Sequence, residues 1–494
     1  MPWRRADAIA LALFGLYWLA FIAVSPATMQ QSLVDDAFIF QRIVDNIWAL
    51  HVWAYNANEL VNPITAPLYA LVLTVCKGFA LGAPSTIAIV YLHGLLALGA
   101  GIYAGLRYRG RAVALAAAVL ISSAHIPVES WGMETSMFLA CLVLSCLTYV
   151  RAMYVCAGVL CACAALCRPE GFALIALLAG LHFIERRVIL WRLILPFLLL
   201  VAPWLAYSYF TFGHVLPNSV SVKAVQHSIG WFKTQPPWFI DFLSQPKLPW
   251  ITYPLAILGG YDAARDVKDH RGRFVLLLVA FGLVQVVAYS FMNAPVGYFW
   301  YMAPGNMALD LMIVLGAFRA SGWAWDRMAR MHRRIPLDDH RLILSAIVVL
   351  CVSKLAMSPM KPIKPFRLGQ EYTEAGEWIN AHTRKEDVVA AAEIGYLGYY
   401  SQRQIRDIHG LIHPYALPFL KREEWDWWFR TDAPQVIVTH SPPWPGEPFW
   451  GGWSARSTLD FENRYVRSAA FGQVQIYEQQ HPAVNGTPTQ LSGY

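Results

Sequence analysis

The sequence predicts an all-α polytopic membrane protein with a small extracytoplasmic α/β domain at its C-terminal end. Of its 494 residues, 57% are hydrophobic and only 14% are charged, and the mean hydropathy is +0.40. Soluble proteins usually carry about 25% charged residues. Repeated apolar runs of about 20 residues predict about eleven transmembrane helices. The last part of the chain alternates polar and apolar residues, which is typical of short strands.

Composition also excludes several classes. The net charge of +7 would suggest a nucleic-acid partner in a soluble chain, but the Lys and Arg residues cluster between apolar runs. There they indicate cytoplasmic loops, so we expect the lipid bilayer as a partner and no nucleic acid. All eight cysteines lie in apolar runs, and residues 366–494 contain none. They predict inert buried thiols, with no metal site and no disulfide framework in the C-terminal part.

The first span is expected at residues 8–27, and Arg4 and Arg5 before it place the N-terminus in the cytoplasm. A signal peptide cleaved after Ala27 is the alternative. We favour an uncleaved helix, because the apolar run exceeds a signal's core and many spans follow. The amphipathic helix expected at 37–50 would then lie along the outer face of the membrane.

The apolar run at residues 64–80 decides the orientation of all later segments. If it crossed the bilayer, Arg107, Arg109 and Arg111 would lie outside, together with every later basic cluster. If it only dips into the outer leaflet, these clusters become cytoplasmic, as the positive-inside rule strongly prefers. Lys77 within the run agrees with a segment that does not span.

The remaining spans are the apolar runs between the basic clusters, and an odd total places the C-terminus outside. We expect a transmembrane domain at 1–358 and a soluble domain at 359–494, with the protein in a bacterial inner membrane and its C-terminal domain in the periplasm. The remaining spans are expected at 84–106, 112–124, 136–150, 152–167, 172–185, 190–212, 249–262, 274–292, 300–318 and 341–357.

The C-terminal part reads as a small sheet domain with a helix near 371–382. Its tryptophans can stack on sugar rings, but we favour a place in the core or in the headgroup belt. These tryptophans are Trp425, Trp427, Trp428, Trp444, Trp450 and Trp453. Short strands are expected at 388–392, 404–408, 435–439 and 474–477.

Asp35 and Asp36 stand where the first span leaves the membrane. Ionisable side chains close to hydrocarbon are costly and indicate a functional site. The alternative is a helix cap, since Phe40, Ile43 and other apolar residues follow at helical spacing. A cap needs one Asp, whereas this position has two.

The other outer loops carry a few polar side chains in otherwise apolar sequence. Arg168 and Glu170 can also pair only with each other, and Glu134 can simply complement a helix dipole. Lys223 and His214 can likewise lie beside anionic headgroups. The polar and aromatic residues expected on this face are Asp35, Asp36, Arg42, Glu59, Asn62, Glu129, Trp131, Glu134, Arg168, Glu170, His214, Asn218 and Lys223.

Several motifs follow one another in these loops and in the C-terminal part. They are Asp35-Asp36-Ala37-Phe38-Ile39, Asn62-Pro63, Gly132-Met133-Glu134-Thr135, Cys167-Arg168-Pro169-Glu170-Gly171, Leu216-Pro217-Asn218-Ser219, Glu393-Ile394-Gly395-Tyr396-Leu397-Gly398-Tyr399-Tyr400 and Asp407-Ile408-His409-Gly410-Leu411. In this order they resemble the GT-C superfamily of polyprenyl-phosphate-dependent glycosyltransferases, and within it the branch of cell-wall arabinofuranosyltransferases. The resemblance covers residues 1–225 and 370–415. In place of the branch's Gly-Gly-Asp-Trp type of motif, the aromatic run Tyr298-Phe299-Trp300-Tyr301 is present.

The resemblance implies transfer of a sugar, such as the pentose arabinofuranose, from a polyprenyl-phosphate donor to a cell-envelope glycan, lipid or protein. The donor brings its own leaving group, so the enzyme must supply a base for the acceptor hydroxyl. Asp35 or Asp36 is implied as this base, with the other orienting it, since pairing raises the pKa of one carboxyl. Arg168, Lys223 and His214 are implied as ligands of the departing phosphate.

The same resemblance assigns substrate binding to further residues and a polyprenyl groove to the neighbourhood of 64–80. A divalent cation, Mg²⁺ or Mn²⁺, between Asp35 and Glu134 stays open, because two carboxylates are too few to predict it. The substrate-binding residues are Arg42, Asn62, Trp131, Glu134, Glu170, Asn218 and Tyr301.

Two other functions remain open. A transporter or lipid flippase would carry charges at mid-span and discontinuous helices in matching halves, whereas the ionisable residues here stand mostly at span ends. A non-catalytic membrane scaffold would tolerate replacement of Asp35 and Asp36, whereas an enzyme would lose activity by orders of magnitude.

We predict that a reporter fused after residue 110 reports the cytoplasm, because the run at 64–80 does not span. Paired alkaline phosphatase and fluorescent-protein fusions in a bacterial host measure this directly. An extracytoplasmic reading would mean that the run crosses the bilayer and would invert every later loop.

Overall fold

The computed structural model describes residues 4–23, 32–79, 82–229, 237–244, 248–265, 272–292, 298–331 and 366–480. The chain divides into two compact units, Met1–Gly369 and Gln370–Tyr494, which are treated separately here. The expected domain boundary at 358/359 and the expected span at 341–357 lie outside the described residues.

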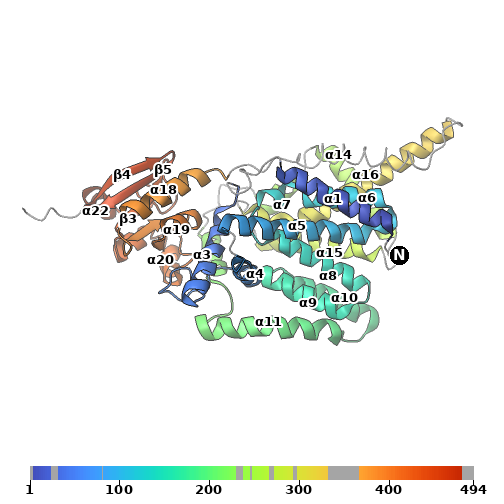
Figure 1. Cartoon of the computed structure of the whole chain (residues 1–494), viewed down its shortest axis with the longest axis horizontal. Coiled ribbons are helices and arrows are strands. Elements are labelled where there is room, and N and C mark those ends of the chain that lie inside the picture. The colour runs from blue at the N-terminus through green and yellow to red at the C-terminus, as the bar shows by residue number, and fades with distance from the viewer. Residues whose placement is uncertain are drawn as a thin grey trace, which may run out of the picture. The chain divides into compact units, whose positions relative to one another are not determined.

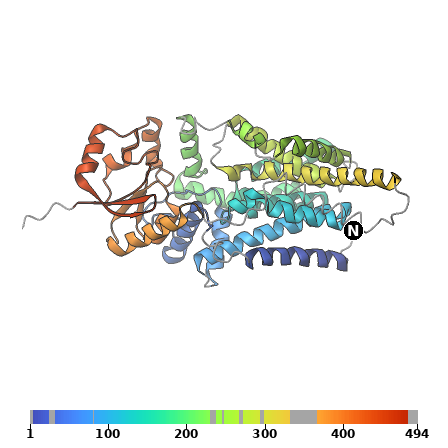
Figure 2. The same cartoon turned by 90° about the horizontal axis from the view of Figure 1, so that it is seen from above.

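The first unit is a bundle of helices whose long members run roughly along one direction in both views (Figures 1 and 2). Within the bundle, α3 lies at the end opposite the N-terminus (Figure 1). The helices are α1 Arg5–Ala23, α3 Asp35–Leu50, α4 Pro67–Lys77, α5 Ala83–Leu106, η1 Arg107–Arg109, α6 Arg111–Ser122, α7 His125–Glu129, α8 Thr135–Val150, α9 Tyr154–Cys167, α10 Gly171–Arg186, α11 Trp191–Phe212, α12 Asn218–Ser228, α13 Trp238–Ser244, α14 Pro249–Arg265, α15 Arg273–Met292, η3 Phe299–Met302 and α16 Ala303–Met331.

Every expected span that falls on described residues coincides with a helix, so the mostly helical membrane fold is confirmed. Four helical segments are long and apolar enough to cross a membrane, namely Ala83–Arg109, Trp191–Phe212, Arg273–Met292 and Phe299–Ala324. Several others are shorter, such as the 12-residue α6, which is about 18 Å long against a hydrocarbon core of about 30 Å. The total of about eleven spans is therefore not confirmed. The 11-residue α4 has the length expected of a segment that does not span.

Asp35 and Asp36 are the first two residues of α3, and neither is its N-cap. The N-cap is Val34, whose extended backbone (φ −72°, ψ 155°) makes no side-chain capping bond. A helix-cap role therefore does not account for the two carboxylates. The rest of α3 buries an apolar face that includes Phe38, Phe40 and Ile43, which positions its first turn.

The loop before α8 packs against the start of α3. The Val34 amide donates to the carbonyl of Trp131 at 3.2 Å, and the Tyr69 hydroxyl of α4 donates to the Gly132 carbonyl at 2.7 Å. Gly132 has φ +95°, and a Cβ there would lie 2.6 Å from Leu33 Cδ2. Only glycine fits this backbone conformation and this close approach.

The second unit contains a mixed five-stranded sheet of order β2-β1-β3-β5-β4. β2, β1 and β3 are parallel, whereas β5 runs antiparallel to both β3 and β4. The elements are α18 Gly369–His382, β1 Val388–Ala391, α19 Gly395–Ser401, β2 Gln404–Asp407, η4 Pro414–Ala416, α20 Leu417–Lys421, α21 Trp427–Thr431, β3 Val436–His440, α22 Ala455–Arg464, β4 Tyr465–Phe471 and β5 Val474–Gln479.

All four expected strands and the expected helix of this unit are present. The sequence did not predict β4, whose residues are largely exposed at the sheet edge and lack a clean apolar alternation. Trp427 and Trp428 are fully buried and Trp425 is 7% exposed, so these three tryptophans belong to the core.

The closest helix packing occurs where α14 crosses α16. A Cβ at Gly316 would lie 1.9 Å from the Leu255 carbonyl oxygen, and one at Gly259 would lie 1.9 Å from the Met312 carbonyl oxygen. Small residues at such crossings let helix backbones approach each other.

We predict that Gly316→Ala destabilises the first unit by about 1–3 kcal/mol, because the added methyl group must separate the two backbones. Thermal unfolding in detergent measures the change. Gly322→Ala in the same helix is the matched control, because nothing lies within 4 Å of a Cβ there, and the helix propensity of alanine is higher. Equal stability of the two variants would contradict the close packing.

Candidate active site

The first turn of α3 presents its two carboxylates differently. Asp35 is buried, with 4% of its surface exposed, whereas Asp36 is half-buried. Burial raises the pKa of Asp36, and the nearby Lys223 ammonium partly opposes this effect. A carboxyl with a raised pKa is a better proton acceptor than an ordinary Asp.

Lys223 comes from α12 and lies among aromatic rings. Its ammonium donates to the Tyr301 hydroxyl at 2.9 Å and lies 4.4 Å from the centre of the Tyr298 ring. It forms no salt bridge within the described ranges, and the Asp36 carboxylate attracts it at longer range. Lys223 is therefore a cation that can accept an anionic ligand.

Arg168 has the opposite character, because it is buried between two carboxylates. Its Nη1 donates to Glu134 at 2.9 Å, and its Nε and Nη2 donate to one oxygen of Glu170 at 3.2 and 3.1 Å. The Tyr289 hydroxyl donates to that same Glu170 oxygen at 2.8 Å. Arg168 therefore pairs with Glu170, as one alternative from the sequence suggested, but not with Glu170 alone, because it also pairs with Glu134.

Glu134 connects this cluster to Asp36. Burial raises the pKa of Glu134, Arg168 opposes the rise, and the charges of Glu170 and Asp36 add to it. Asp36 is attracted by Lys223, whereas Glu134 is bound by Arg168. These two carboxylates are called the acidic pair of the site.

Tyr301 lies between the two cations. The Arg168 guanidinium carbon is 5.2 Å from the centre of its ring, and Lys223 binds its hydroxyl. Tyr301 of the turn η3 therefore contacts both Arg168, which follows α9, and Lys223 of α12. The arrangement brings together Asp36, Glu134, Arg168, Glu170, Lys223 and Tyr301.

Two of the expected site residues hold loops. Arg42 donates through Nε to the Tyr55 carbonyl at 3.0 Å and stacks on the Tyr55 ring at 4.6 Å, which fixes the loop after α3. His214 contacts the Leu216 carbonyl of its own loop at 2.7 Å.

Asn62, Asn218 and Trp131 support the site from its edges. The Asn218 amide donates to the Asn62 carbonyl at 2.9 Å, which ties the start of α12 to the segment before α4. The Asn62 side chain is fully buried, and its amide has no hydrogen-bond partner among the described residues. Trp131 is fully buried and its ring lies 4.9 Å from that of Tyr91, so it packs the loop that carries Glu134.

Sequence reasoning missed Tyr289. It lies inside an apolar run, where a tyrosine gives no sequence signal, yet it donates to Glu170 in the cluster. The described residues contain no group of three or more His, Cys, Asp or Glu side chains able to hold a metal ion. A divalent cation between Asp35 and Glu134 therefore stays an open proposal.

The fold and the site can now be compared with known proteins. Residues 364–485 match a family described as a domain of unknown function, DUF8728, and no curated protein matches the sequence. The crystal structure of ArnT from Cupriavidus metallidurans bound to undecaprenyl phosphate matches with a TM-score of 0.56 and 15% identity, over 93% of this chain and 97% of that one. The crystal structure of the same protein in the apo state matches over 94% of this chain and 98% of that one, with the same TM-score and identity.

A weaker likeness is to the arabinofuranosyltransferase AftD from Mycobacteria, with a TM-score of 0.48 and 14% identity, over 97% of this chain but 40% of that one. The stronger match shows the fold, which agrees with the helical membrane fold and small sheet domain that the sequence predicted. In particular, this chain has the fold of ArnT over nearly the whole length of both proteins.

We predict that Arg168→Met lowers the free energy of unfolding by about 3–5 kcal/mol at pH 8, because two buried carboxylates lose their cation. Without Arg168, which lowers the pKa of Glu134, that pKa rises further. Glu134 then takes up a proton more readily at low pH, so the deficit should shrink at pH 5. Thermal unfolding at both pH values measures it, with Tyr289→Phe as a milder control. An equal deficit at both values would contradict the ion cluster.

Proposed function

We propose that this protein is an integral-membrane glycosyltransferase. It moves a hexose or a pentose from a polyprenyl-phosphate donor to a cell-envelope glycan, lipid or protein. The observation that carries the proposal is the acidic pair Asp36–Glu134 beside the Lys223 ammonium, on the fold of ArnT. A base and an anion site side by side are what transfer from a lipid phosphate requires.

The fold supports the donor class. ArnT was solved with undecaprenyl phosphate bound, which is the leaving group that such a donor releases. In this chain Lys223 is the cation best suited to that phosphate, because its ammonium is held by a hydroxyl and two aromatic rings instead of by a carboxylate. The neighbourhood of α4 would shape the groove for the polyprenyl tail.

The reaction follows from these positions. Asp36 accepts the proton of the acceptor hydroxyl, and the acceptor oxygen forms a bond to the anomeric carbon. The bond from that carbon to the phosphate oxygen breaks, and the polyprenyl phosphate leaves with the electron pair. Lys223 stabilises the charge that develops on the phosphate, in a partly buried setting where such stabilisation is strong.

Asp36 is a better base than Asp35 on this geometry. Asp36 is partly accessible and lies within the field of Lys223, whereas Asp35 is buried. Arg168 acts differently from the phosphate ligand that the resemblance implied. Because two carboxylates already balance its charge, its role is to hold Glu134 next to Asp36.

The proposal also includes the location and orientation of the protein in the cell. The protein lies in a bacterial inner membrane with its N-terminus in the cytoplasm. The reaction site and the C-terminal domain face the periplasm, where polyprenyl-linked sugars and envelope acceptors meet.

We predict that Asp36→Asn lowers kcat by a factor of about 10²–10⁴, because the amide cannot accept the proton. The change in kcat is measured with full-length protein in nanodiscs, as the transfer of label from polyprenyl-phosphate sugars to an envelope glycolipid fraction. Asp45→Asn is the matched control, because Asp45 lies on the same helix and pairs with Lys77 away from the acidic pair. Full turnover by Asp36→Asn, with Asp35→Asn also active, would refute the base.

A further inference from the structure

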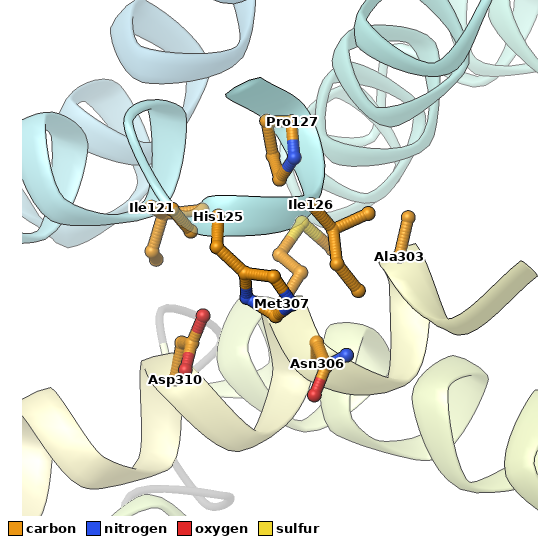
Figure 3. Close-up of a pocket in the computed structure, with 9 residues that line it drawn as sticks. Ile121, His125, Ile126, Pro127, Ala303, Asn306, Met307 and Asp310 are labelled. Carbon is orange, nitrogen blue, oxygen red and sulfur yellow. The ribbon is translucent and has the colours of Figure 1, made fainter. Parts of the chain in front are cut away.

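A second polar site lies between α7 and the beginning of α16. The pocket there is lined by His125 of α7 and by Asn306 and Asp310 of α16. Figure 3 shows the His125 imidazole directed toward α16, where Asn306 and Asp310 lie one turn apart on the same face. Its other walls are apolar and include Ile121, Ile126 and Met307.

Two polar groups of α16 in this pocket, Asn306 and Asp310, have no hydrogen-bond partner for at least one polar atom among the described residues. Within the described ranges, Asp310 forms no hydrogen bond and no salt bridge, whereas Asp7 and Asp262 of neighbouring helices are each paired with arginines. Asn306 is 8% exposed, and its Nδ2 has no hydrogen-bond partner. An unpaired carboxyl group on a membrane helix is costly and indicates a function.

The pocket is joined to the candidate active site through the chain. The loop that carries Glu134 follows α7 directly, and η3, which carries Tyr301, leads directly into α16. Asp310 is nine residues after Tyr301 and seven after Ala303, the start of α16, so it lies about 10 Å along that helix. A substrate at Tyr301 that extends along the first two turns of α16 would place a neighbouring group in the pocket.

The chemistry of the pocket selects the kind of group. Asp310 repels a phosphate, so the anionic part of the donor belongs with Lys223. A carboxylate acceptor beside an amide donor matches a hydroxyl group, which both donates and accepts. A metal ion fits less well, because the described lining offers one carboxylate and one imidazole but no third His, Cys, Asp or Glu side chain.

We infer that Asp310 and Asn306 bind a hydroxyl group of one of the two substrates, the transferred sugar or the acceptor. This inference rests on the proposed function and adds residues that determine specificity. Both the sugar of the donor and the acceptor carry hydroxyl groups that could fill the pocket. Kinetic measurements in which each substrate is varied in turn distinguish these two sources.

The test compares Asp310→Asn and Asn306→Ala with Ser321→Ala, a polar residue of the same helix that does not line the pocket and whose hydroxyl donates to the Phe318 carbonyl. Full-length proteins in nanodiscs are assayed with polyprenyl-phosphate hexoses and pentoses and with an envelope glycolipid fraction. Binding of undecaprenyl phosphate, which has no sugar, is measured separately. We expect KM for either the donor or the acceptor to rise about tenfold in both polar variants, with kcat within threefold. Undecaprenyl phosphate binding of all variants and the kinetics of Ser321→Ala should stay within twofold of wild type.

A rise in the donor KM assigns the pocket to the transferred sugar, and a rise in the acceptor KM assigns it to the acceptor. Unchanged KM values for both substrates, in variants with wild-type unfolding temperatures, would overturn the inference. Weaker undecaprenyl phosphate binding in Asp310→Asn would also overturn it. A wild-type protein that transfers no sugar from any donor would instead contradict the proposed function.

Discussion

The site depends on one buried cation, Arg168, placed between two buried glutamates. Each buried charge would cost several kcal/mol alone, so the guanidinium and its two carboxylates stay together. Since Glu134 precedes α8, Arg168 follows α9 and the Tyr289 hydroxyl comes from α15, the cluster fixes three helices relative to one another. Glu134 is therefore held in place by Arg168, where the charge of Asp36 also acts on it.

The sequence predicted the members of this site better than their partners. Short outer loops with a few charges made Asp36, Glu134, Arg168 and Lys223 conspicuous, because charge beside hydrocarbon is rare without a use. Which carboxylate each cation would bind could not be predicted, since that depends on how α8, α9 and α12 pack. Tyr289 illustrates the same limit, because its importance comes only from the carboxylate that tertiary packing brings to it.

Some motif residues are explained by local structure. Arg42 and His214 bind carbonyls of nearby loops, a pairing that residue type alone does not reveal. In the C-terminal unit, the Asp407 carboxylate accepts from the amides of His409 and Ile412 at 2.8 and 3.2 Å. This Asx-type turn closes the loop after β2, so the motif at 407–411 is accounted for by folding.

Charge also determines how an anionic lipid donor can enter. Lys223 attracts a phosphate, and the tyrosine rings around it exclude water and leave that attraction weakly screened. The carboxylates of Asp36, Glu134 and Asp310 would each repel a phosphate that is bound anywhere other than beside Lys223. A donor held by its phosphate at Lys223 must therefore turn its uncharged sugar toward the carboxylates, where hydroxyl groups are the favourable partners. In the proposed reaction, the same electrostatic field would bind the leaving group and orient the reacting carbon toward the base.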